Sequence, residues 1–218
     1  MPTPTPRPHV AADPLAADPL VADPLATDPL VLAQDGVATV HQLMDLGCAS
    51  STIPARCRPP AGPWRRLLPR VIVLQTTTPT PRQRLRGALL YAGPDALLTG
   101  PAVLALHEVE SAPPLAALPK VDVLVTHRAP LRGHAYVRVH PTMRRAPRTP
   151  VQGLPCAPLA RAVSDAIPHL DSGEAVTRLL AEVAQRALCR PEELLGELDA
   201  GHLVGDPCVM AAVRAMTW

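Results

Sequence analysis

The chain has 218 residues and a formal net charge of +2, and 29 of its residues are proline while none is phenylalanine. Lys120 is the single lysine, so the chain has no Gly-Lys-Ser/Thr phosphate loop. Leu118 stands where a nuclease of the PD-(D/E)xK type needs an acid. The chain has neither a long apolar run nor an apolar leader, so we expect no membrane contact. The five scattered cysteines suit reduced thiols in a cytoplasm.

Charge is segregated along the chain. Residues 46–94 contain eight arginines and no acidic residue, and residues 123–164 contain seven arginines and no acidic residue. The segments 1–45, 95–122 and 165–218 are acidic. Two purely basic blocks in a nearly neutral chain are typical of a surface that contacts phosphates. A general preference for arginine on solvated faces would give the same pattern, so both interpretations stay open.

The N-terminus carries a tandem pentapeptide, AADPL-AADPL-VADPL-ATDPL, over residues 11–30. A proline at every fifth position is incompatible with a continuous helix, and each residue before a proline is biased to extended geometry. We therefore predict a disordered arm over residues 1–27. A repeat expansion without function is the simpler interpretation of the pentapeptide itself.

Residues 28–78 show the order helix, helix, turn, helix and hairpin. Asp28 and Thr39 are expected to cap the first two helices, 28–34 and 40–46, and Ser50 or Ser51 a third that ends near Arg58. Strands are expected at 64–67 and 71–74. This order is typical of a winged helix-turn-helix, in which the third helix enters the major groove and the hairpin lies along the backbone. The predicted DNA-contacting residues are Ser51, Thr52, Arg56, Arg58, Arg65, Arg66 and Arg70.

Residues 79–205 are predicted to form an α+β domain, followed by a C-terminal tail at 206–218. A helix begins at Pro81 and ends before Gly93-Pro94, and a short one covers 102–107. A high content of β-branched residues predicts a strand at 121–126. Alternation predicts a second strand at 136–140, with Tyr136, Arg138 and His140 on one face. Further helices are expected at 159–166, 174–187 and 191–198. The fold class is therefore α+β, with a winged helix-turn-helix in front of a mixed domain.

Four segments carry a resemblance to a known family: VLAQDGVATVHQLMDLG at 31–47, PWRRLLPRVIVL at 63–74, PRQRLRGALLYAGPDALLTGPAVLALHEV at 81–109, and VQGLPCAPLARAVSDAI at 151–167, which continues to RPEELLGELDAG at 190–201. In this order and spacing the chain resembles the AbiEi-type antitoxins of type IV toxin–antitoxin systems. The resemblance implies a cytoplasmic repressor of its own operon, with double-stranded operator DNA and a cognate nucleotidyltransferase-like toxin as partners. It implies no enzymatic activity, catalytic residue, metal or cofactor.

The chain departs from that family at several points. Many relatives continue into a nuclease domain, whereas this chain ends at Trp218, so we expect no nuclease activity. Thr99-Gly100 replaces a Ser-His pair, and the wing turn reads LPRVI at 68–72. Arg161 and Asp165 are retained at a spacing that permits a structural ion pair on one helix face.

Two alternatives accompany the repressor hypothesis. One is a decayed antitoxin, or an interaction module that acts only through a protein partner. The other is a hydrolase or transferase that uses histidines with an acid. Its candidates are His107 with Glu108 or Glu110, and His127, His134 and His140 of the second basic block. The convergence of these histidines on one acid would favour this second alternative.

Overall fold

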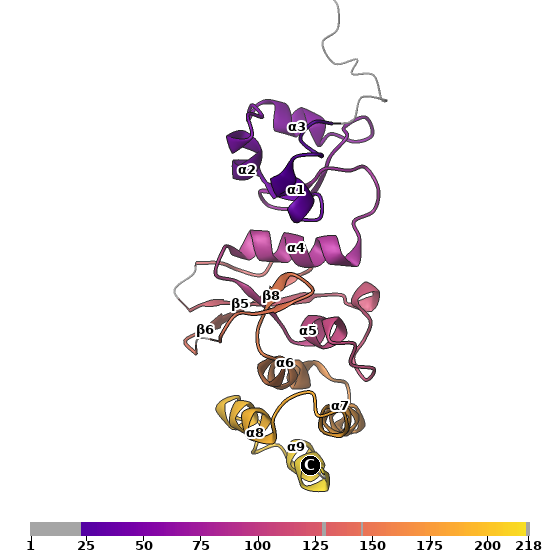
Figure 1. Ribbon diagram of the computed structural model, residues 1–218, viewed down its shortest axis with the longest axis vertical. Coiled ribbons are helices and arrows are strands. Elements are labelled where there is room, and N and C mark those ends of the chain that lie inside the picture. The colour runs from indigo at the N-terminus through magenta and orange to yellow at the C-terminus, as the bar shows by residue number, and fades with distance from the viewer. Residues whose placement is uncertain (1–22, 128–129, 145, 217–218) are drawn as a thin grey trace, which may run out of the picture.

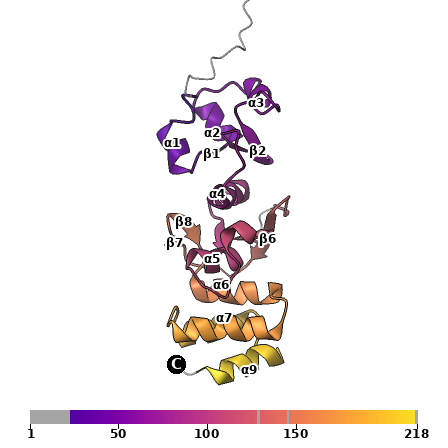
Figure 2. The same cartoon turned by 90° about the vertical axis from the view of Figure 1, so that its right-hand side faces the viewer.

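The computed structural model describes residues 23–127, 130–144 and 146–216. The chain is a mixed α+β protein, as expected from the sequence. Its layers are stacked along the long axis of the molecule (Figure 1). A small N-terminal unit lies at one end, a five-stranded sheet covered by helices lies in the middle, and three helices form the other end, as Figure 2 shows from the side. No helix in the described ranges is long and apolar enough to span a membrane.

The N-terminal unit contains three short helices and a three-stranded antiparallel sheet with the strand order β1-β3-β2. Its elements are α1 (Pro29–Ala33), β1 (Val37–Thr39), α2 (Val40–Asp45), α3 (Thr52–Arg56), β2 (Arg65–Leu68) and β3 (Val71–Val73). A separate apolar cluster fills it, made of Val31, Ala38, Leu43, Ile53, Trp64, Ile72 and Leu74. Strand β1 was not predicted, whereas the three helices and the hairpin were.

Side-chain caps set the first two helices. The Asp28 carboxylate accepts the Leu30 N–H at 2.8 Å, and Pro29 occupies the first helical turn. Thr39 and Gln42 form a reciprocal capping box, with distances of 3.1 Å and 2.8 Å. The caps predicted at Asp28 and Thr39 are therefore confirmed. Ser51 precedes α3 as expected, but its side chain makes no capping hydrogen bond.

The central sheet has the strand order β6-β5-β4-β8-β7. Its strands are β4 (Leu97–Thr99), β5 (Val121–Thr126), β6 (Val137–Thr142), β7 (Thr149–Val151) and β8 (Leu154–Cys156). The pairs β5–β6 and β4–β8 are parallel, and the other two are antiparallel. The sheet lies between helix α4 (Pro81–Ala92) and the helices α5 (Pro101–Leu106) and α6 (Leu159–Ala166) (Figure 1).

The C-terminal layer contains α7 (Gly173–Gln185), α8 (Pro191–Ala200) and α9 (Pro207–Ala215), and the 3₁₀ segments are η1 (Leu115–Ala117) and η2 (Ile167–His169). The tail predicted at 206–218 is wrong for most of its length. Asp206 accepts the N–H groups of Cys208 and Val209 and so caps α9. Val209 and Ala212 are buried in the main core. This helix has only nine residues, which is too few for the periodicity of its apolar residues to distinguish a helix from a tail.

Helix α4 belongs to both units. Leu85, Ala88 and Leu89 share one core cluster with Val37 and Val73 of the N-terminal sheet and with residues of the central sheet and of α6 to α9. The expected domain boundary at 78/79 therefore crosses a continuous core. The turn before β1 reinforces this connection, because Asp35 pairs with Arg82 at 2.7 Å and with Arg86 at 3.1 Å.

Glu182 joins α7 to the loop after α5. Its carboxylate accepts the backbone N–H groups of Glu110 at 2.7 Å and Ser111 at 2.8 Å, and pairs with Arg186 at 2.6 Å. Burial by itself would raise the pKa of this carboxyl, but the hydrogen bonds from Ser111, Glu110 and Arg186 lower it to about 2. The anionic form is thus the one that the fold stabilises.

We expect Glu182→Gln to lower the free energy of unfolding by about 2 kcal/mol at pH 7. Because the folded pKa lies below the unfolded value of 4.5, the stabilisation is present above pH 4.5 and is lost as the pH falls towards 2. Urea unfolding of wild type and variant at several pH values between 7 and 3 checks this. The difference between their free energies of unfolding should become smaller as the pH falls. Glu174→Gln, at an exposed carboxylate of the same helix, is the control and should show no such difference. A difference independent of pH would contradict the assignment.

Candidate nucleic-acid interface

Helix α3 is held against the N-terminal core by its apolar side. Ile53 is buried beside Trp64, while Ser51 and Thr52 are exposed at the start of the helix. Pro54 lies in the first turn, where a missing N–H removes only a donor that has no partner within the helix. The helix ends at Arg56 and therefore has five residues, as short as the position of Pro54 suggested.

The β2–β3 hairpin exposes basic side chains. Its turn at Pro69-Arg70 is tight, with Arg70 at a φ of +62°, and a register shift lies between Arg66 and Leu68. Arg65 and Arg66 are both exposed, whereas Leu68 is buried. The hairpin therefore presents three arginines to solvent while its apolar residues anchor it to the core.

Four of the eight arginines of residues 46–94 already have partners within the fold, and one of them is Arg84, whose guanidinium lies 4.8 Å from the centre of the Tyr136 ring. Arg82 and Arg86 pair with Asp35, and Arg56 pairs with Asp23. No acidic group in the described ranges forms an ion pair with the remaining four arginines, which are exposed. They are Arg58, two residues after the end of α3, and Arg65, Arg66 and Arg70 of the hairpin. We call these four residues the arginine surface. It offers positive charge at the end of the molecule that carries the N-terminal unit (Figure 2).

The sequence predicted Arg56 as a DNA-contacting residue, but in this conformation its guanidinium is already engaged. Its Nη1 lies 3.0 Å from the Asp23 carboxylate, and its guanidinium stacks 4.7 Å from the centre of the Trp64 ring. Asp23 also accepts the Trp64 indole N–H at 2.6 Å. The prediction of a disordered arm over 1–27 is therefore wrong for Asp23 and the turn after it, and residues 1–22 lie outside the described part.

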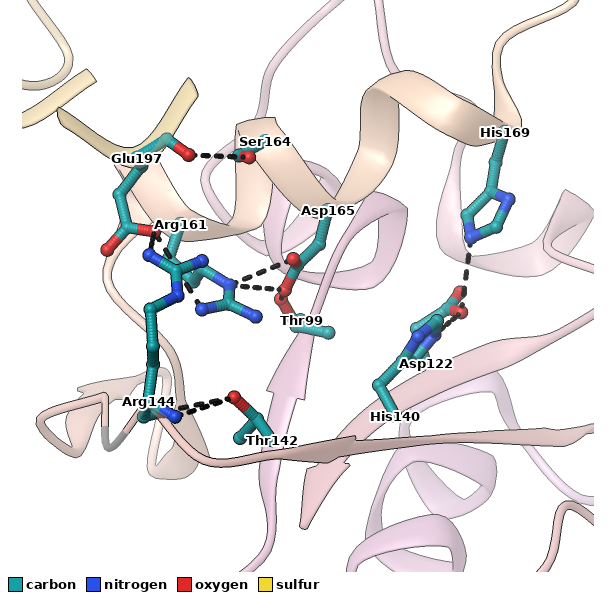
Figure 3. Close-up of polar contacts among 10 residues, drawn as sticks. All are labelled: Thr99, Asp122, His140, Thr142, Arg144, Arg161, Ser164, Asp165, His169 and Glu197. Atoms are coloured by element: carbon teal, nitrogen blue, oxygen red, sulfur yellow. Dashed lines mark hydrogen bonds and ion pairs between the residues drawn. The ribbon is translucent and has the colours of Figure 1, made fainter. Parts of the chain in front are cut away.

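A second polar cluster lies on the central sheet, around Asp122 (Figure 3). Asp122 is buried in β5, and its Oδ1 contacts His140 Nε2 at 2.6 Å and Arg138 Nη1 at 3.1 Å. Arg138 and His140 are two residues apart on β6 and both contact Asp122, so they share one face of the strand, as the sequence predicted. His169 in η2 lies 3.7 Å from the same oxygen. The other candidate histidines, His107, His127 and His134, contribute no ligand atom to this cluster.

The ligand atoms of Asp122, His140 and His169 lie within 4.8 Å of one another, and two imidazoles with a carboxylate form a donor set that divalent metals accept. However, the guanidinium of Arg138 occupies the same carboxylate oxygen and places a positive charge beside it. Burial lowers the pKa of His169, and Arg138 adds to that effect. We therefore interpret the cluster as a polar network that joins β5, β6 and η2, with Arg138 and Asp122 as its ion pair.

The predicted structural pair, Arg161 and Asp165, is formed. Arg161 Nε lies 2.8 Å and 3.0 Å from the two carboxylate oxygens, and the Thr99 hydroxyl donates to Asp165 at 2.6 Å. Glu197 of α8 joins the network through Arg144 at 2.8 Å and Arg161 at 3.8 Å (Figure 3). The pair thus ties the central sheet to α6 and α8.

No pattern in the sequence indicated that His169 or Glu197 belongs to these networks. His169 is 47 residues from Asp122, and no motif spacing connects them. The one indication was the Thr99-Gly100 departure from the family. Gly100 lies beside Asp122, because a Cβ there would be 3.6 Å from the Asp122 Cβ, and Thr99 contacts Asp165.

Comparison with known proteins adds no identification. No protein-family model matches the chain. No curated protein matches it with significant sequence similarity.

Proposed function

We propose that the chain is a DNA-binding transcriptional repressor that contacts duplex DNA through the N-terminal unit. The arginine surface is the observation that carries this proposal, because its four exposed guanidinium groups lie on the segment that follows α3 and on the adjoining hairpin. Arginine presents a planar fork of donors that matches phosphate oxygens and guanine edges. The element order of residues 28–78 supports the same interpretation, since it is the order expected for a winged helix.

Contacts to the phosphate backbone dominate this mode of binding. Helix α3 has only five residues and spans about 7.5 Å at 1.5 Å per residue. Few of its side chains can therefore reach base edges, and the candidates are Ser51, Thr52 and Arg56. The hairpin arginines supply charge along the backbone, which gives affinity and orientation but little sequence discrimination.

The resemblance extends the proposal to an antitoxin that represses its own operon and binds a nucleotidyltransferase-like toxin. The helical layer of α7 to α9 lies at the end of the molecule opposite the arginine surface (Figures 1 and 2). Residues 165–218 contain nine acidic residues and four arginines. A helical layer that is separate from the DNA-binding end would leave room for a protein partner while DNA is bound.

The test compares binding to the DNA upstream of its own gene with binding to scrambled DNA, by fluorescence anisotropy at low and moderate salt. The fourfold variant Arg58→Ala/Arg65→Ala/Arg66→Ala/Arg70→Ala should weaken binding at least about tenfold at 50 mM salt. It should also reduce the slope of log K against log [salt] by about 3 to 4. Wild type should prefer its own upstream DNA, with Arg56 contributing to that preference.

The matched control removes the same charge elsewhere, in Arg132→Ala/Arg178→Ala/Arg190→Ala/Arg214→Ala, where all four side chains are exposed. It should bind DNA nearly as well as wild type, because these side chains lie outside the arginine surface. If both variants lose the same amount of DNA affinity, the loss reflects net charge alone and contradicts the proposal. Failure of wild type to bind either DNA would favour the module that acts only through a protein partner.

A further inference from the structure

One unit of the N-terminal repeat is docked on the N-terminal core. Asp23 Oδ1 accepts the Leu25 N–H at 3.1 Å, and Asp23 Oδ2 accepts the Trp64 indole N–H at 2.6 Å and pairs with Arg56 at 3.0 Å. Leu25 and Ala26 pack against the apolar cluster that contains Trp64. Both carboxylate oxygens and the leucine side chain of the Asp-Pro-Leu unit are thus used.

The receiving groups form a built site for a carboxylate. Trp64 is only 3% exposed, and its indole N–H needs an acceptor at that depth. Arg56 stacks on the Trp64 ring, which fixes the guanidinium beside the indole N–H. Two donors therefore converge on one oxygen, and the Asp23 side chain that supplies it is 17% exposed. We call Arg56 and Trp64 together the aspartate cradle.

The sequence supplies more than one candidate for this cradle. Asp28-Pro29-Leu30 is committed to capping α1. The units Asp13-Pro14-Leu15 and Asp18-Pro19-Leu20 have the same three residues as the docked unit Asp23-Pro24-Leu25. A shift of the arm by one unit adds five residues to the connecting loop, and the entropy of loop closure grows only logarithmically with length.

We propose that the aspartate cradle is a binding site for the Asp-Pro-Leu units of the arm, and that an occupied cradle holds Arg56 away from DNA. The inference rests on the proposed function, because it assigns a regulator to the same surface. A tethered unit competes at an effective concentration of about 1 mM, and three interchangeable units keep the cradle filled when one is lost. The repeat is thus a built-in competitor of DNA, in which each carboxylate takes the place of a phosphate.

The first experiment measures DNA affinity of the full chain. Asp23→Asn should raise the affinity no more than about twofold, because Asp18 or Asp13 replaces it, whereas Asp13→Asn/Asp18→Asn/Asp23→Asn should raise it about tenfold. The control Asp171→Asn/Glu174→Gln/Asp199→Asn removes the same charge at exposed positions near the opposite end of the molecule. An equal gain in the control would overturn the proposal.

The second experiment reads the cradle without DNA. The indole N–H resonance of Trp64 should stay near its wild-type position in Asp23→Asn, where another carboxylate takes its place. It should move upfield in the triple variant, where only neutral amide oxygens remain as acceptors and the hydrogen bond is weaker. An unchanged resonance in the triple variant would overturn the proposal even if DNA binding is strong. If no variant binds DNA but the resonance moves as expected, the cradle is retained and the proposed function fails.

Trp64→Phe tests the cradle from the other side without changing any charge. It keeps an aromatic ring in the core and removes the indole N–H, so it should raise DNA affinity and should add little to the triple variant. Additive gains in affinity would show that the arm and the cradle act independently, which would also overturn the proposal.

Discussion

Replacing Asp165 by alanine is expected to lower the free energy of unfolding by about 3–5 kcal/mol. Asp165 accepts two hydrogen bonds from Arg161 and one from Thr99. The Arg161 side chain is only 10% exposed, so loss of the carboxylate leaves a nearly buried guanidinium with Glu197 at 3.8 Å as its remaining partner. The cost comes mainly from this unpaired buried charge and only partly from the lost contact.

The double variant Arg161→Leu/Asp165→Ala separates the two contributions. With the guanidinium removed, the variant should recover much of the stability lost in Asp165→Ala, since replacing both partners by apolar groups is often neutral. Urea unfolding at pH 7, followed by far-ultraviolet circular dichroism, gives both values. Asp171→Ala, at an exposed carboxylate, is the matched control and should change stability little. A loss below about 1 kcal/mol for Asp165→Ala would contradict the role of the pair.

Local sequence signals predicted the helices well because their causes are local. Asp28-Pro29 and the Thr39 capping box define helix starts through contacts of two or three residues, and both are present in the structure. Helix α6 has the predicted bounds, and α7 and α8 begin within one residue of their predicted starts. Each of these features depends on spacing along one element.

The short strands escaped prediction for a physical reason. Strands β1, β4, β7 and β8 have three residues each, so none contains enough positions to show a period of two. Pro150 and Pro155 also lie within β7 and β8, where a proline normally argues against a strand. These two prolines face each other in register, so neither strand has an N–H to donate at this position of the ladder.

The candidate DNA-contacting residues also include some whose environment follows from local sequence and one whose environment depends on a distant contact. The exposure of Arg58, Arg65, Arg66 and Arg70 follows from the local order of helix and hairpin, which the sequence predicted. The ion pair of Arg56 with Asp23 joins residues that are 33 positions apart in the sequence, and it depends on the burial of Trp64 in the core. No local pattern carries that information, although the repetition of Asp-Pro-Leu marked the segment as unusual.

Leu180→Ala is expected to lower the free energy of unfolding by about 2–5 kcal/mol. Leu180 is fully buried in α7, within the core cluster that extends from β1 to α9. Truncation removes favourable burial and leaves a cavity that the surrounding helices can fill only in part. Leu195→Ala on α8, where the side chain is 41% exposed, is the matched control and should cost less than about 1 kcal/mol.

The same variant tests whether the two ends of the molecule unfold together. Because Leu180 shares one continuous core with Val37 and Val73 of the N-terminal sheet, its loss should shift the unfolding of the N-terminal unit as well. In a Trp218→Phe background Trp64 is the remaining tryptophan, so its fluorescence reports on that unit while circular dichroism reports on the whole chain. Coincident transitions, both displaced by Leu180→Ala, are expected. A displaced circular dichroism transition with an unmoved Trp64 transition would show that the N-terminal unit folds independently, and that α4 does not couple it to the rest.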